Sequence, residues 1–390
     1  MSLLRSDRFP AIVLLAAAAL GLILANSAAG PFAQDVQHAY IGIPGIFELS
    51  VGHWIADGLL VFFFFVVAVE LQYELTKGQL ASARKALQPA IAAAGGVIVP
   101  IIVFLIFTAG SDVTSGWPIP TATDIAFALG VLAVFGRGLP SGVRIFLLAL
   151  AILDDIVGIV FIAVLFTSDV NYALLGLAVL TVAAFGFVSR MLDSRAKGLI
   201  ITILIVLAIA TWVLVYLSGV HATIAGVALG LVMAQQPALR VRHEMEPWVN
   251  GIVLPLFAFS SALVIIPNVP LAELSPAFWG ILVALPVGKI IGITIFGWIS
   301  QRVVQGGGKR LPIGDLLAAG ALGGIGFTVS LLLSELAFAS NDEVRDEATL
   351  GVLAGSGIAV ILAAVIVSWR ARYYRRIAAA EGSTESAATA

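Results

Sequence analysis

Twelve long apolar runs constrain this chain more than any other feature of its sequence. A helix needs about 20 apolar residues to cross the hydrocarbon core of a bilayer. Runs of that kind lie at residues 9–29, 52–73, 87–110, 119–136, 145–168, 171–189, 198–217, 219–235, 248–268, 277–300, 315–338 and 348–369. Only 11% of the 390 residues are charged, whereas a soluble domain carries roughly 25% charged residues. The sequence therefore predicts an all-α polytopic membrane protein with twelve transmembrane helices, and excludes a soluble enzyme or a disordered protein.

The charge balance and the absence of cysteine exclude further classes. A net charge of −2 offers no basic face for nucleic acid, and a chain without cysteine has no disulfide, catalytic thiol or zinc–thiolate site. No linker is long enough to separate a second folded domain, so we expect residues 1–378 to form a single transmembrane domain. The small, polar residues 379–390 are predicted to be a disordered cytoplasmic tail. No enzymatic activity and no cofactor are predicted.

Lysine and arginine alternate between the two sides of this twelve-span arrangement. Nineteen of the 21 basic residues lie at the N-terminus, after even-numbered spans or at the C-terminal end. The opposite loops carry mostly Asp and Glu, including an acidic cluster at residues 342–347. The positive-inside rule then predicts that both termini are cytoplasmic. The first 30 residues also resemble a signal peptide, but their long apolar run favours an uncleaved first span.

Several ionisable residues fall deep within the predicted spans. Lys289 lies thirteen residues from both Pro276 and Arg302, which is about 20 Å from either end of a helix. Asp154 and Asp155 are about 15 Å from the basic end of their span by the same rise per residue. An isolated charge at this depth costs at least about 2.5–3.5 kcal/mol. We therefore expect these groups to cluster, so that they pair, share protons or bind a cation.

Asp124 joins this set if the chain before it is extended. Pro118 and Pro120 favour extended backbone, which covers about 3.3 Å per residue and would carry Asp124 to a similar depth. The simpler alternative is a static bridge between Lys289 and one aspartate. That alternative accounts for one carboxylate and leaves two without a partner.

Two predicted spans are interrupted at matching places. Span 4 begins with the run 118–124, rich in proline and threonine, and span 11 contains a glycine-rich run at 320–328. Each is the middle member of a triplet, spans 3–5 and spans 10–12, and the two triplets have opposite orientations. This pattern indicates inverted-topology repeats with two discontinuous crossing helices and a site where they meet. Glycine in span 11 could instead serve close helix packing.

At these residues the sequence resembles the bacterial NhaA family of sodium/proton antiporters. The stretches that carry the resemblance occur in order along most of the chain: 121–130 (TATDIAFALG), 149–155 (ALAILDD), 218–226 (SGVHATIAG), 254–259 (LPLFAF), 288–292 (GKIIG) and 323–328 (GGIGFT). The resemblance implies an electrogenic exchanger of the bacterial inner membrane that moves two protons inward for each Na⁺ or Li⁺ exported. It also implies alternating access and a role in pH regulation.

The resemblance assigns expected roles to the deep residues. Asp155 matches the main cation-binding carboxylate, so Na⁺ is expected there. Asp154 matches its neighbour, which pairs with the lysine corresponding to Lys289 and takes part in proton carriage. Thr123 and Asp124 match the pair at the helix crossing, where the aspartate offsets exposed helix-end dipoles. Backbone oxygens near Thr123 could complete the cation's coordination.

Four further residues match the family near the span ends. His221 matches a histidine linked to the pH response, Glu70 and Glu74 match acidic residues of a cytoplasmic funnel, and Asp57 matches a carboxylate near the outer end of span 2. The simpler interpretation is that Asp57, Glu70 and Glu74 lie at span ends, where water solvates their carboxylates. The residues around 72–73, 242–246 and 260–263 depart from the family pattern, so its pH profile is not carried over.

The outer loop 38–49 alternates apolar residues around a Pro-Gly pair, which predicts a short hairpin. In the family such a hairpin holds a homodimer, so a homodimer through this loop is expected.

Adjacent aspartates on one helix point about 100° apart, which limits how they can share an ion. We expect Asp155 to bind the cation while Asp154 turns toward Lys289. Protons and Na⁺ then compete for the same carboxylates, and these titrations are coupled. Two rival functions remain open: a sodium-coupled symporter of organic anions with a similar broken-helix core, and an intramembrane aspartyl protease.

Overall fold

The computed structural model describes residues 9–43, 47–167, 170–192, 194, 196–267, 270–304 and 310–388. These residues are mostly helical and fall into two compact units. Unit 1 comprises mainly residues 13–81 and 157–265, and unit 2 mainly residues 82–156 and 266–388. Each unit is described by itself, and the single domain at residues 1–378 stays a prediction.

Seven helices in the described part of the chain are long and apolar enough to cross a membrane. They are Val51–Thr76, Ala86–Phe107, Ser141–Leu165, Tyr172–Ser189, Lys197–Leu217, Pro276–Val303 and Asp342–Ile377. Three bent pairs raise this number to ten if each pair is one span: Phe9–Ala25 with Gly30–His38, Thr114–Thr121 with Ile125–Phe135, and Ile313–Gly323 with Phe327–Ala337. The chain is therefore a polytopic, mostly helical protein, and the full set of twelve spans stays a prediction.

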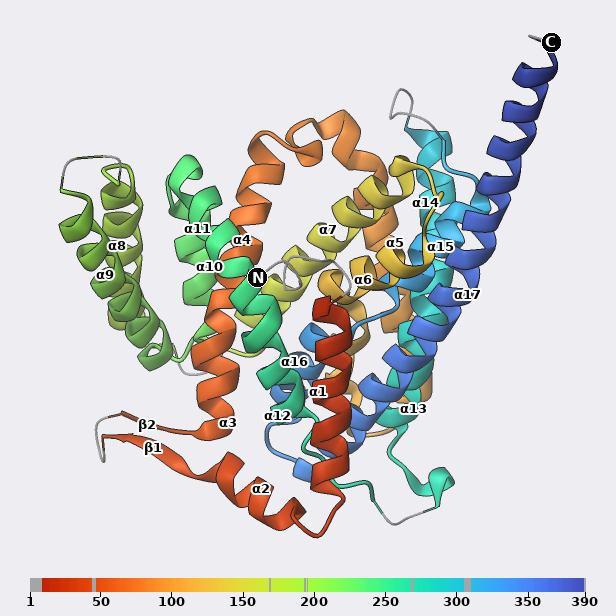
Figure 1. Ribbon diagram of the computed structural model, residues 1–390. Coiled ribbons are helices and arrows are strands. Elements are labelled where there is room, and N and C mark those ends of the chain that lie inside the picture. The colour runs from red at the N-terminus through yellow and green to blue at the C-terminus, as the bar shows by residue number, and fades with distance from the viewer. Residues whose placement is uncertain are drawn as a thin grey trace. The chain divides into compact units, whose positions relative to one another are not determined.

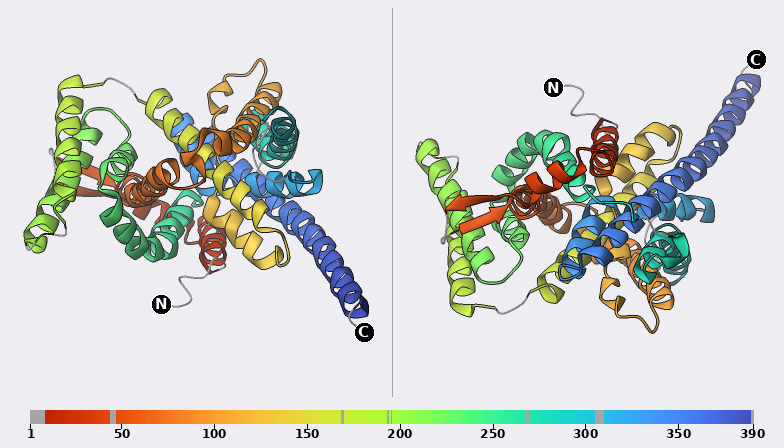
Figure 2. Two further views of the ribbon diagram at one scale, coloured as in Figure 1. Left: turned by 90° about the horizontal axis from the view of Figure 1, so that it is seen from above. Right: turned by 90° about the horizontal axis from the view of Figure 1, so that it is seen from below.

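Unit 1 combines helices with one short hairpin. Its elements are most of α1 (Phe9–Ala25), α2 (Gly30–His38), β1 (Tyr40–Ile43), β2 (Phe47–Ser50), α3 (Val51–His53), α4 (Leu60–Thr76), α8 (Tyr172–Ser189), α9 (Lys197–Leu217), α10 (Thr223–Val232), α11 (Gln235–Trp248) and α12 (Leu254–Ser261). The antiparallel strands pair Tyr40 with Ser50 and Ile43 with Phe47, which confirms the hairpin expected in this loop. Its tip, residues 44–46, lies outside the described residues. Figures 1 and 2 show α8 and α9 side by side.

Unit 2 is built from helices, several of them interrupted. Its elements are α5 (Ala83–Phe107), α6 (Ile125–Phe135), α7 (Ser141–Leu165, of which the part up to Ile156 lies in this unit), α13 (Pro276–Val283), α14 (Lys289–Val303), α15 (Ile313–Gly323), α16 (Phe327–Ala337) and α17 (Asp342–Ala388). A π-helical turn, Ala284–Gly288, joins α13 to α14. Helix α14 packs on α5 and α15, and α15 packs on α17 (Figure 1).

Two glycines let α5 and α14 approach each other closely. A Cβ on Gly95 would lie 2.5 Å from the carbonyl oxygen of Gly292, and a Cβ on Gly288 would lie 2.9 Å from Pro100. Side chains at these positions would therefore force the helices apart. This contact fixes the position of Lys289, the first residue of α14, against α5.

Within unit 2, loops that the charge pattern assigns to one side do lie together. The Arg375 guanidinium donates to the backbone oxygen of Arg137 at 3.3 Å, so the loop after α6 meets the C-terminal part of α17. At the other end, the backbone N–H of Ser275 donates to the Glu347 carboxylate at 2.6 Å. The loop after α6 thus lies at the arginine-rich end of α17, and the segment before α13 lies at its acidic end.

Unit 1 shows the same grouping. The end of α4 meets the start of α11, where Gln235 donates to the Thr76 hydroxyl at 2.6 Å. The loops at the opposite ends meet where Asn171 N–H donates to the Ser218 carbonyl at 2.9 Å. Both contacts join loops that the alternation of charge places on the same side. The assignment of the basic side to the cytoplasm stays a prediction.

Helix α17 is longer than the sequence suggests. Its backbone stays helical to Ala388, through most of the segment 379–390 for which the sequence predicts a disordered tail. Alanine has the highest helix propensity, and the run Ala378–Ala380 continues the helix from the preceding arginine-rich turns.

Candidate cation-binding site

The two interrupted segments of unit 2 meet at their breaks. The first break, Ala122–Asp124, separates a 3₁₀ turn at Ile119–Thr121 from α6, and the flanking helices are bent by 42°. The second break separates α15 from α16, which are bent by 49°. The backbone N–H of Asp124 donates to the carbonyl of Ile325 at 2.6 Å, which joins the two breaks directly. Extended backbone in the interior is possible here because its polar groups find partners within the protein.

One carboxylate serves two helix N-termini at this junction. Asp124 Oδ1 accepts from the backbone N–H of Phe127, in the first turn of α6, at 2.9 Å. Its Oδ2 accepts from the backbone N–H of Thr328, in the first turn of α16, at 3.3 Å, and from the Thr328 hydroxyl at 2.8 Å. A negative charge at a helix N-terminus offsets the partial positive charge there. Asp124 is therefore placed to stabilise α6 and α16 together.

Lys289 is fully buried at the middle of the 28-residue span Pro276–Val303. Its ammonium donates to Asp154 Oδ2 at 2.6 Å, to the Thr123 hydroxyl at 3.1 Å and to the carbonyl of Thr121. An ammonium has three N–H groups, so this set satisfies all of them. Lys289 therefore forms hydrogen bonds with both the first break and α7.

Thr123 links three elements through one hydroxyl. Its oxygen lies 2.8 Å from Asp154 Oδ2 and 2.8 Å from the carbonyl oxygen of Gly323. A hydroxyl has a single proton, so Thr123 donates to one of these oxygens while it accepts from Lys289. The side chain can therefore switch between the carboxylate and the second break without moving far.

Asp155 is the carboxylate that takes no part in the hydrogen bonds of Asp124, Lys289 and Thr123. As whole residues, Asp155 is 6% exposed and Asp154 is 1% exposed, so both are removed from solvent. The Oδ1 atoms of Asp154 and Asp155 are buried and have no hydrogen-bond partner. A buried, unpartnered carboxylate oxygen is costly, and a bound proton or cation would relieve that cost.

The donor set limits what kind of ion this part of the unit can hold. Among the described residues, no group of three or more His, Cys, Asp and Glu is arranged to hold a metal ion. A cation near Asp155 would therefore be held by one or two carboxylates together with neutral hydroxyl or carbonyl oxygens. Such oxygen-rich coordination of low charge suits a hard monovalent cation better than a transition metal.

The four other residues singled out in the sequence belong to unit 1. Asp57 Oδ1 lies 3.3 Å from His221 Nε2, and His221 Nδ1 lies 2.9 Å from the Thr223 hydroxyl. Glu70 forms an ion pair with Arg242 at 2.5 Å. Asp57 and Glu74 are buried, so the reading of these carboxylates as solvated span-end groups is wrong for both.

Sequence reasoning missed a buried ionic group at the start of α15. Asp315 is fully buried; it accepts from Arg370 Nε at 2.8 Å and from the Tyr374 hydroxyl at 2.6 Å. The Ser356 hydroxyl was also missed, and it accepts from the backbone N–H of Phe327 at 3.2 Å. Asp315 lies near a span end and Ser356 is a lone serine in an apolar helix, so no sequence pattern marked either residue as part of a buried polar contact.

Comparison with known proteins adds a family to this geometry. The profile of the family described as Na⁺/H⁺ antiporter 1 matches residues 1–367. This chain belongs to that family. The matched region includes both breaks, both adjacent aspartates and Lys289.

Individual members of the antiporter family are similar over nearly the whole chain. The Na(+)/H(+) antiporter NhaA 2 of Clavibacter michiganensis subsp. michiganensis is 54% identical over 387 residues, which cover 97% of this chain and 94% of that protein. The Na(+)/H(+) antiporter NhaA of Tropheryma whipplei (strain Twist) is 48% identical over 94% of this chain and 95% of its own length. The Na(+)/H(+) antiporter NhaA 3 of Streptomyces coelicolor is 42% identical over 97% of this chain and 82% of its own length.

Proposed function

We propose that this chain exchanges Na⁺ for protons across a membrane, with the cation held at Asp155. Family membership supports the exchange, and the unpartnered, buried oxygens of Asp154 and Asp155 support the place. Among the residues that the structure describes, no cationic side chain pairs with Asp155, because Lys289 is engaged with Asp154. This last feature carries the proposal.

Exchange follows from competition for the same oxygens. A protonated Asp155 is neutral and has lost much of its attraction for Na⁺, whereas the ionised form binds the cation. Asp154 and Lys289 form the second proton-carrying pair, because protonating Asp154 breaks its ion pair with the lysine. Transfer of two protons for one Na⁺ moves one net charge, so a potential of 100 mV would contribute about 2.3 kcal/mol per cycle. We infer that Li⁺, with the same charge and preference for oxygen, is also carried.

The broken helices supply the means of alternating access. We propose that spans 3–5 and 10–12 form inverted repeats whose discontinuous members cross at Asp124, and that Asp124 and Lys289 compensate the charges of the helix ends. A carboxylate shared by α6 and α16 would keep the two N-termini together while the surrounding helices move. We further propose an inner-membrane location with cytoplasmic termini, a homodimer through the 38–49 loop, and a pH response through His221, Glu70 and Glu74.

One experiment separates this function from its rivals. Purified protein is reconstituted into liposomes that contain a pH-sensitive dye, and NaCl is added with no other solute. We expect proton movement on addition of NaCl or LiCl, and none on addition of choline chloride. A requirement for an organic anion would instead support the symporter, and no ion-dependent proton movement would contradict exchange.

A further inference from the structure

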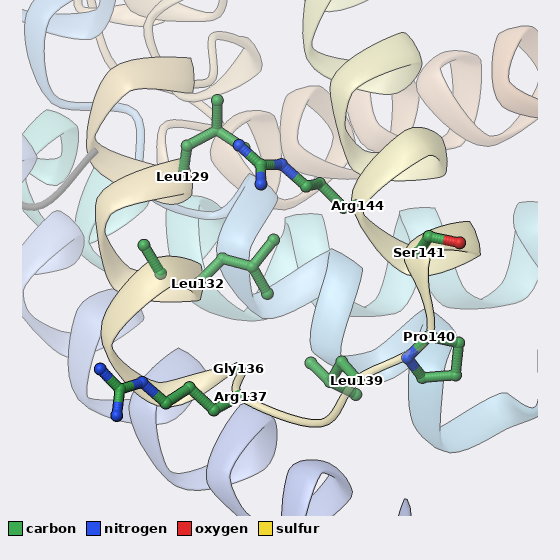
Figure 3. Close-up of a pocket in the computed structure, with 9 residues that line it drawn as sticks. Leu129, Leu132, Gly136, Arg137, Leu139, Pro140, Ser141 and Arg144 are labelled. Carbon is green, nitrogen blue, oxygen red and sulfur yellow. The ribbon is translucent and has the colours of Figure 1, made fainter. Parts of the chain in front are cut away.

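A cavity of about 350 Å³ lies between the end of α6 and the beginning of α7 in unit 2 (Figure 3). Its walls are formed by the last turns of α6, the loop that follows and the first turn of α7. Leu129, Leu132 and Leu139 supply apolar surface, and Arg137 and Arg144 supply the charge. This is a mixed surface, apolar along one part and cationic along another.

The charge on this surface has one sign. Arg137 and Arg144 are the only charged residues between Asp124 and Asp154. In Figure 3 the Arg144 side chain extends from α7 toward Leu129 on α6, while the Arg137 side chain extends from the end of α6 away from Arg144. The C-terminal part of α17 adds a third guanidinium, because Arg375 donates to the backbone oxygen of Arg137. Planar guanidinium groups can bind phosphate oxygens in bidentate fashion.

The surroundings of the cavity indicate where such an anion comes from. Val134, Phe135 and Ile145, which neighbour the lining residues on both helices, expose 40–45% of their surface. Exposed apolar side chains on helices of a membrane protein are typical of surfaces that face lipid. An anion that carries acyl chains could place its charged group in the cavity and its chains along these residues, whereas free phosphate would make only the polar contacts.

We propose that this cavity binds the phosphodiester headgroup of an anionic glycerophospholipid of the phosphatidylglycerol type. Arg144 binds the phosphate oxygens, Arg137 adds positive charge at the end of α6, and the N-terminal turn of α7 adds a favourable dipole. Leu132 and Leu139 pack against the glycerol backbone and the first acyl carbons. The binding inference uses only unit 2 contacts and does not depend on ion exchange.

A lipid bound here would join two helices that carry the ion site. Asp124 caps α6 at its other end, and Asp154 follows Arg144 by ten residues on α7, about 15 Å along the helix. The headgroup would therefore hold α6 and α7 together at their basic ends. We expect bound lipid to raise the thermal stability of the full-length protein.

The test compares lipid binding by charge variants of the intact protein in neutral detergent. Binding of short-chain phosphatidylglycerol is measured by titration, with short-chain phosphatidylcholine and inorganic phosphate as separate ligands. The double variant Arg137→Gln/Arg144→Gln should bind phosphatidylglycerol at least about tenfold more weakly, because a charge-assisted contact and a second nearby positive charge are lost. Arg302→Gln is the matched control. It removes one charge from the same basic end of unit 2, where Arg302 stacks over Trp298 at 3.4 Å, and should leave affinity within about twofold.

Each result decides the proposal. Equal affinity of the double variant and the wild type, or equal binding of phosphatidylcholine, overturns it. If inorganic phosphate binds tightly and displaces the lipid, the cavity is a site for free phosphate and the proposed lipid ligand is wrong. If the double variant does not fold, Leu132→Trp, which fills the apolar part of the cavity without changing charge, should also lose phosphatidylglycerol binding. Retained binding in that variant contradicts the proposed position.

Discussion

Two sets of carboxylates, one in each unit, differ in how their charge is balanced. In unit 1, the buried Asp57 faces His221 and the partly exposed Glu70 faces Arg242, so each of these two carboxylates has its own basic partner. In unit 2, three carboxylates of Asp124, Asp154 and Asp155 share a single ammonium, that of Lys289. Asp124 is stabilised by helix N-termini, so of these three Asp155 is the carboxylate without an ion-pair partner in the described part of the chain. We infer from this contrast that an excess of buried negative charge, and not burial alone, is what would make Asp155 a cation site.

The largest effect is expected from removing that excess. Asp155→Asn keeps the shape of the side chain but loses its charge. The rate of sodium-dependent proton movement in proteoliposomes should therefore fall by at least about 100-fold. Asp57→Asn, which changes a carboxylate that already has a basic partner, is the matched control from unit 1 and should retain exchange. Full exchange by Asp155→Asn would refute the assignment of the cation to this residue.

Removing the shared ammonium should be the next largest change. Lys289→Ala leaves Asp154 without its partner, and breaking a buried pair costs about 3–5 kcal/mol while the carboxylate stays ionised. A proton can neutralise Asp154, so the loss of stability should be large at pH 8 and smaller at pH 6. Thermal unfolding at the two pH values checks this difference. The double variant Lys289→Ala/Asp154→Asn should recover part of the stability at pH 8, and a Lys289→Ala protein as stable as wild type would argue against the bridge.

A smaller loss is expected where Asp124 joins the two broken segments. Thr328→Val keeps the shape but removes the hydroxyl that donates to Asp124 at 2.8 Å, a hydrogen bond to a charged group worth about 1.5–3 kcal/mol. Thr294→Val is the matched control, because the buried Thr294 hydroxyl has no hydrogen-bond partner. Chemical denaturation of both variants should show a loss only for Thr328→Val. Equal losses would mean that the bond to Asp124 contributes nothing beyond packing.

The smallest effect should come from the paired carboxylates of unit 1. Glu70→Gln removes half of an ion pair that is partly solvent-exposed, so its contribution is at most about 1 kcal/mol. We expect the maximal exchange rate at saturating Na⁺ to stay within about threefold of wild type, with any change confined to its pH dependence. A loss as deep as that of Asp155→Asn would remove the distinction between the two units.

The sequence singled out the buried charges of unit 2 more clearly than it located the helix ends. Asp124, Asp154, Asp155 and Lys289 stand out because charge inside an apolar run is rare, and all four are buried. Asp154 and Lys289 form hydrogen bonds with Thr123, whereas a cation site at these residues stays a prediction. Asp315 and Ser356 gave no such signal, because a carboxylate near a span end and a serine in an apolar helix are both ordinary.

Apolar runs also do not reveal where a helix stops. The predicted span 219–235 is helical only at Thr223–Val232, in α10, and the predicted span 248–268 is helical as far as Ser261, through a π-helical turn at Val249–Val253 and then α12. Gly219, before α10, has a positive φ of 83°, which no residue of a right-handed helix adopts. Such breaks depend on turn geometry and packing, which hydropathy does not report.

Proton release on binding tests the central claim most directly. Purified protein in weakly buffered detergent solution is titrated with NaCl while a pH-sensitive dye records released protons, for the wild type and for Asp155→Asn. If Na⁺ and protons compete for one carboxylate, the wild type should release protons, and its apparent affinity for Na⁺ should fall about tenfold for each unit of pH on the acid side. The variant should release none. Sodium binding by the wild type with no proton release and no pH dependence would contradict the account.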